Sequence, residues 1–73
     1  MEGKTTLSGI KEKYRFIDTN LAGLADVDLA VIERMLQRKP VARWQAEQVL
    51  EVLSVITEEN YSIDTVDVVL AET

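Results

Sequence analysis

Eight basic side chains are the residues of this sequence best suited to bind a ligand, and all of them precede position 44. Lys and Arg neutralise phosphate groups, and their binding to a polyanion releases condensed counterions. The first 43 residues hold six acids against these eight bases, whereas the rest of the chain holds seven acids and no base. A phosphate-binding surface is therefore expected in the first 43 residues. The alternative is that the net charge of -5 only keeps a small protein soluble.

The chain contains no cysteine and no histidine. This excludes disulfides, thiolate nucleophiles and His-based catalysis, and it removes the usual zinc ligands. Asp64 and Asp67 lack a neighbouring ligand cluster, so we expect them to be a helix cap and a solvated carboxylate rather than a metal site. A catalytic carboxylate needs an enclosed pocket, which so short a chain does not easily form. We expect no enzyme activity, no metal and no cofactor.

The length of 73 residues allows one hydrophobic core, so residues 1–73 are expected to form a single domain. No apolar run of signal-peptide length follows Met1, and no stretch approaches the ~20 apolar residues of a membrane span. We therefore expect a cytoplasmic protein without a membrane partner. Residues 1–6 are expected to be flexible, and residues 66–73 to form a tail.

Apolar residues recur at helical spacing, and the chain has only three glycines and one proline to interrupt helices. This predicts an all-α fold, a compact bundle of four to five helices. The first helix is expected to start at Ser8 or at the threonine pair before it. The predicted buried stripe of this helix is Leu7, Ile10, Tyr14 and Ile17.

A second, short helix is predicted over residues 18–25, with Asp18 as its N-cap. Its predicted buried residues are Leu21, Leu24 and Ala25. Asp26 tolerates left-handed backbone, so we expect a sharp turn there before Asp28 caps a third helix. This third helix is predicted over residues 28–38 and is expected to end before Pro40.

The longest predicted helix covers residues 41–57. Its expected core residues are Trp44, Val49, Leu50, Leu53 and Ile56. Ser62 is expected to cap a single turn over residues 63–66. The β-branched segment 66–70 is expected to be extended and to pack on its own domain or on a neighbour.

The segment LAGLADVDLAVIERM has the apolar spacing, the small residue and the turn residue that a helix-turn-helix requires. With AEQVLEVLS and YSIDTVDVVL after it, the chain resembles the lambda-repressor-like DNA-binding domains of the Cro/cI or XRE type. The resemblance implies a transcriptional regulator that places residues 28–38 in the major groove of double-stranded DNA, often as a two-fold dimer.

The resemblance also implies which side chains meet DNA. The base-facing positions are Asp28, Leu29, Ala30, Glu33 and Gln37. The expected phosphate contacts are Lys11, Lys13, Arg15, Arg34, Arg38, Lys39 and Arg43. The family usually has glycine at the turn, where this chain has Asp26, and polar or basic side chains at the base-facing positions.

The acidic C-terminal third of the chain and the non-basic recognition helix favour an alternative in which the fold is kept as a protein-interaction or assembly module with little or no DNA binding. A homodimer is expected in the DNA-binding case, through the fourth helix or residues 66–70, because two coupled half-sites increase affinity.

Overall fold

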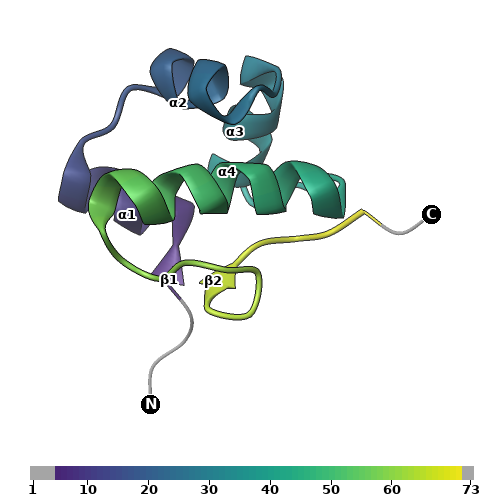
Figure 1. Cartoon of the computed structure of the whole chain (residues 1–73). Helices are drawn as coiled ribbons and strands as arrows, with labels where there is room; N and C mark the ends of the chain where they lie inside the picture. The colour runs from purple at the N-terminus through teal and green to yellow at the C-terminus, as the bar shows by residue number, and fades with distance from the viewer. Residues whose placement is uncertain (1–4, 72–73) are drawn as a thin grey trace.

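The computed structural model describes residues 5–71, which form one compact and mostly helical body (Figure 1). Its elements in chain order are β1 (Thr5–Thr6), α1 (Leu7–Tyr14), α2 (Asp18–Ala25), α3 (Leu29–Leu36), α4 (Arg43–Thr57) and β2 (Val66–Asp67). The prediction of a small helical bundle is confirmed, with four helices in the described residues and a short parallel strand pair added to them.

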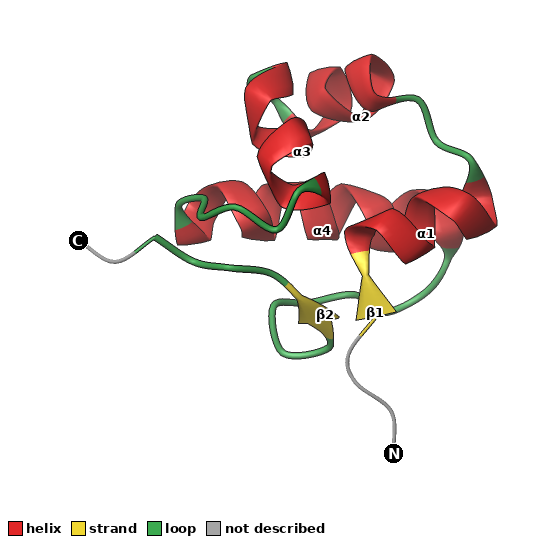
Figure 2. Ribbon diagram, turned by 180° about the vertical axis from the view of Figure 1, so that it is seen from behind, coloured by secondary structure: helices red, strands yellow, loops and turns green. Residues whose placement is uncertain are grey.

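The helices and strands lie in three levels, which both views show in the same order (Figures 1 and 2). α2 and α3 lie on one side of the long helix α4, and the strand pair lies on the other side. α1 leads directly from β1 into the bundle and packs against α3. This arrangement leaves α2 and α3 at one surface of the molecule.

The helix ends follow local rules. The hydroxyl of Thr6 accepts a hydrogen bond from the backbone N–H of Gly9 (3.0 Å), so the threonine pair caps α1. Gln45 accepts from the backbone N–H of Ala42 (3.1 Å) at the start of α4. Arg15, Asp26, Arg38 and Glu58 follow the four helices and all have left-handed backbone, with φ between 58° and 61°.

α3 ends for a different reason from the one predicted, which was Pro40. The helix ends at Leu36, before the proline acts, because the backbone turns through left-handed Arg38. The N–H of Lys39 then donates to the carbonyl of Arg34 (2.8 Å), which satisfies a carbonyl at the helix end. Asp28 occupies the predicted N-cap position, but its side chain makes no capping hydrogen bond.

The core is entirely apolar among the described residues and joins all four helices to β2. Its largest fully buried side chains are Leu7, Ile10, Leu21, Ile32, Val41, Val49, Leu50, Leu53 and Val66. Burying such side chains is the main favourable contribution to folding.

Thr5 and Thr6, which lie in the segment expected to be flexible, pair in parallel with Val66 and Asp67; residues 1–4 lie outside the described residues. Val41 also bridges Leu70, with its N–H donating to the carbonyl of Val69 (3.0 Å). Residues 66–71 of the predicted tail are therefore extended and pack on their own domain, and residues 72–73 lie outside the described residues. Val66 is part of the core, and its strand pairing with Thr5 holds it there.

Four predicted core positions are exposed: Ile17, Leu24, Trp44 and Ile56. Ile17 is exposed because α1 ends at Tyr14 and the chain changes direction. Leu24 and Ile56 lie on outward faces of α2 and α4. Trp44 is 58% exposed, so its prediction as a core anchor is wrong.

The position of Trp44 has a simple geometric reason. The buried stripe of α4 is Ala46, Val49, Leu50 and Leu53. At 3.6 residues per turn this stripe extends back to positions 42 and 43, and Trp44 falls beside it.

Candidate nucleic-acid interface

The α2–α3 corner has the sharp turn that a helix-turn-helix needs. Asp26 has φ 59° and ψ 45°, which is the left-handed conformation predicted for it. The N–H of Val27 donates to the carbonyl of Ala22 (3.1 Å), and this bond closes the end of α2. The chain therefore turns sharply within the three residues between the helices, and α3 packs against α2.

α3 has one apolar face and one solvent face. Val31, Ile32 and Met35 are buried against the other helices. The five positions predicted to face bases, Asp28, Leu29, Ala30, Glu33 and Gln37, are all exposed. Had Leu29, Ala30 and Glu33 been buried, α3 would have had no free face to offer a ligand.

The solvent face of α3 has mixed chemistry. Leu29 and Ala30 offer methyl groups that suit a thymine methyl, and Glu33 can accept from a cytosine amino group. Arg34 is the one cation among the exposed residues of α3 itself. Asp28 and Glu33 repel phosphates, so the face is not strongly attractive to a polyanion.

Three of the predicted phosphate contacts lie at the end of α1 or just after it. Lys11 donates to the carboxylate of Asp18 at 2.8 Å, which ties α1 to the first turn of α2. The ammonium of Lys13 lies 5.3 Å from the ring centroid of Tyr14. Arg15 is exposed on its left-handed backbone.

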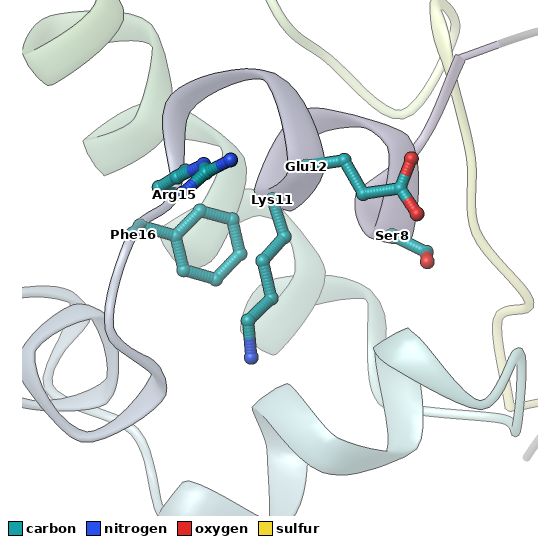
Figure 3. Close-up of a pocket in the computed structure, with 5 residues that line it drawn as sticks. All are labelled: Ser8, Lys11, Glu12, Arg15 and Phe16. Carbon is teal, nitrogen blue, oxygen red and sulfur yellow. The ribbon is translucent and has the colours of Figure 1, made fainter.

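An open depression lies beside these α1 residues (Figure 3). Lys11 extends alongside the ring of Phe16, with its ammonium 6.0 Å from the ring centroid, and Glu12 lies on the other side of the depression. The carboxylate of Glu12 offsets part of the positive charge that Lys11 and Arg15 bring there.

The other four predicted phosphate contacts lie in α3, the segment after it and the start of α4. Arg38 pairs with Asp67 of β2 at 2.7 Å, and Arg43 pairs with Glu47 at 3.4 Å within α4. Arg34 and Lys39 are exposed and form no ion pair with another described residue. Three of the seven predicted phosphate contacts thus already have a carboxylate partner, the third being Lys11.

Sequence reasoning missed a second exposed feature at the same corner. A groove runs between the end of α2, the turn and the start of α4, and its lining includes Gly23, Asp26, Asp28 and Trp44. The signal in the sequence was the register of α4, because Trp44 does not fit the stripe that contains Ala46.

A tyrosine pair joins the end of α1 to the segment after α4. The hydroxyl of Tyr14 donates to the carboxylate of Glu59 at 2.9 Å, and this bond raises the pKa of Tyr14 above its usual value. Burial and the neighbouring Tyr14 raise the pKa of Tyr61 as well. The bond between Tyr14 and Glu59 holds the connection between α4 and β2 against α1.

Residues 5–71 hold neither a membrane-spanning helix nor a cluster of metal ligands. No helix there is both long and apolar enough to span a bilayer. No three acidic, histidine or cysteine side chains in the same range gather as a metal site would require. Asp64 is exposed beside Ser62, whose hydroxyl accepts from its N–H at 3.2 Å, and Asp67 is the partner of Arg38.

Comparison of the chain with protein-family models, with curated proteins and with solved structures gave no significant match. The fold and the geometry of the α2–α3 corner are therefore the basis of the functional argument.

Proposed function

We propose that this protein is a DNA-binding transcriptional regulator that inserts α3 into the major groove of double-stranded DNA. The observation that carries the proposal is the orientation of α3. Its apolar residues are buried, its predicted base-facing residues are exposed, and it follows α2 through a left-handed turn at Asp26. This is the arrangement in which helix-turn-helix proteins present a recognition helix.

The ion pairs distinguish cations whose charge is available to phosphate from cations that already have a carboxylate partner. Lys13, Arg15, Arg34 and Lys39 have no carboxylate partner among the described residues, so their charge is available to a polyanion. Lys11, Arg38 and Arg43 must give up a carboxylate to bind phosphate, which lowers their net gain. We expect weak, mainly electrostatic binding with modest base preference.

A second candidate function is a protein-interaction module with little or no DNA binding. The specific observation in its favour is the exposure of Trp44, at 58%, in a groove at the α2–α3 corner that Asp26 and Asp28 also line. Exposed aromatic side chains are enriched at protein–protein interfaces.

One titration separates the two functions. Fluorescence anisotropy of labelled random and genomic duplexes is measured with the full chain at low and at fourfold higher salt. Four phosphate contacts predict a log-log salt slope of about -3.6, which is a loss of affinity of about 100-fold over this range. Arg34→Ala should flatten the slope by about one unit, whereas Glu51→Gln on α4 is the control and should not flatten it.

Absence of binding at low salt would contradict the DNA proposal and leave the interaction module. We also propose that the DNA-bound form is a homodimer, because a single short recognition helix binds weakly alone. The tail is an unsuitable dimer contact because Val66 is in the protein's own core, so the exposed Val55 and Ile56 of α4 are the better candidates. Sedimentation with and without duplex measures this.

A further inference from the structure

The groove at the α2–α3 corner combines an aromatic wall with acidic rims. Trp44 of α4 forms one wall, and Asp26 and Asp28 from the turn line the same groove. None of the residues that line it is basic. The groove is therefore electronegative and has an exposed indole.

Gly23 keeps this groove open. Glycine is a poor helix former, yet Gly23 lies inside the eight-residue helix α2 with ordinary helical backbone. A Cβ added there would meet no atom within 4 Å, so neither packing nor backbone conformation requires glycine. Because Gly23 lines the groove, a longer side chain at this position has open space at the edge of the groove.

The two carboxylates are not used by the fold. Asp28 stands at the N-cap of α3 without making a capping hydrogen bond, and neither Asp26 nor Asp28 forms an ion pair within residues 5–71. The C-terminus of α2 at Asp26 adds the negative end of a helix dipole, whereas the N-termini of α3 and α4, at Asp28 and beside Trp44, add positive ends. The two carboxylates without a basic partner in the described residues are therefore what favours positive charge in the groove.

We propose that this groove binds an arginine or lysine side chain of a partner protein. A guanidinium suits it best, because the planar group stacks on an indole and donates paired hydrogen bonds to carboxylates. Asp26 and Asp28 repel a phosphate backbone, which argues against a nucleic acid as the occupant. The site deepens the second candidate function, the protein-interaction module, and it shares Asp28 with the face of α3 proposed to meet bases.

Trp44 is the only tryptophan of the chain, so its fluorescence reports directly on the groove. The probe is the peptide acetyl-Gly-Arg-Gly-Arg-Gly amide, and its control has citrulline, a neutral isostere, in place of arginine. We expect saturable change in Trp44 emission in the millimolar range with the arginine peptide, and binding at least about fivefold weaker with citrulline. No DNA is present, so failure here is distinct from failure of the proposed function.

Two variants test the assignment to this groove. Asp26→Asn with Asp28→Asn removes the charges, yet asparagine accepts left-handed backbone and suits an N-cap. Gly23→Gln places a side chain in the groove while leaving the core unchanged. Each variant should lower the affinity for the arginine peptide by about tenfold. The control Glu51→Gln with Asp64→Asn removes the same charge elsewhere, and its affinity should stay within about twofold of the parent.

Three results would overturn the proposal. They are equal binding of the arginine and citrulline peptides, unchanged binding by the Asp26 and Asp28 double variant with a native melting curve, and tighter quenching of Trp44 by oligothymidylate than by the peptide. The last would make Trp44 a stacking platform for a nucleic-acid base.

Discussion

The guanidinium of Arg38 lies 2.7 Å from the carboxylate of Asp67, so the residue just after α3 is paired with β2. Arg38 also has left-handed backbone, and it lies just beyond the end of α3. A predicted phosphate contact is therefore neutralised by the acidic C-terminal third of the same chain. The pair therefore joins a base from the first 43 residues, which are net positive, to an acid from the remainder of the chain, which holds no base.

Removing Asp67 should increase DNA affinity. Asp67→Asn frees Arg38 from a surface ion pair worth less than about 1 kcal/mol, so we expect affinity to rise about twofold to threefold and the salt slope to steepen by about one unit. The melting temperature should change little. Anisotropy titrations at two salt concentrations measure both effects.

The control for this prediction is the double variant Arg38→Ala with Asp67→Asn. If Arg38 carries the gain, the double variant loses it. A gain that persists without Arg38 would mean that Asp67 acts only through the net charge of the protein.

Trp44→Ala should destabilise the protein only slightly, by less than about 1 kcal/mol, because the ring is mostly exposed. Leu53→Ala on the same helix is the matched comparison. Leu53 is fully buried, so its loss should cost about 2 to 5 kcal/mol. Thermal or urea unfolding measures both, and similar losses in the two variants would mean that Trp44 packs in the core.

The helices were predictable from the sequence because their apolar spacing survives in the structure. The α2–α3 turn was predicted for the right reason, since Asp26 adopts the left-handed backbone that its side chain tolerates. Ile32 and Met35 are buried at the spacing that a helix requires. Once the apolar residues of α3 are assigned to the core, its other residues must face solvent. This predicted the exposed candidate recognition face.

Other features were not predictable from local pattern. Arg15 and Glu58 also have left-handed backbone, but neither residue type signals it, so the end of α1 was placed too late. The pairing of Thr5 with Val66 depends on contacts between residues far apart in the chain, which local pattern does not encode. The ion pair between Arg38 and Asp67 has the same origin.

Substitution at the turn should depend on backbone preference more than on charge. Asp26→Val places a β-branched residue at φ 59° and should cost about 1 to 2 kcal/mol. Asp26→Gly fits this backbone and should stay within about 1 kcal/mol of the parent. Urea unfolding compares the two, and equal stability would contradict a left-handed turn at Asp26.

Alkaline pH should destabilise the fold through the tyrosine pair. The pKa values of Tyr14 and Tyr61 are raised in the folded state, so the folded protein holds these protons more tightly than the unfolded chain. The resulting stability is present below about pH 10, the unfolded value, and is lost as pH rises through the folded pKa values.

Glu59→Gln is the matched variant for this pH dependence. It removes the carboxylate that raises the pKa of Tyr14, so ionisation of Tyr14 should begin at lower pH and the alkaline loss of stability should shrink. Urea unfolding across the alkaline range, with tyrosinate absorbance recorded in parallel, measures both changes. The same pH profile in the parent and the variant would contradict a role for this hydrogen bond.

Truncation after Thr65 should destabilise the protein strongly without changing its oligomeric state. The cut removes Val66 from the core, the β1–β2 pairing and the bridge from Val41 to Leu70. Burial of one valine is worth about 1.5 to 3 kcal/mol, so the melting temperature should fall by at least about 10 °C in so small a domain. A chain ending at Ala71 keeps these contacts and is the control. Sedimentation at micromolar concentration should give the same oligomeric state for both chains, because the tail packs on its own domain. A dimer that dissociates only on truncation after Thr65, with an unchanged melting temperature, would place the tail between two copies instead.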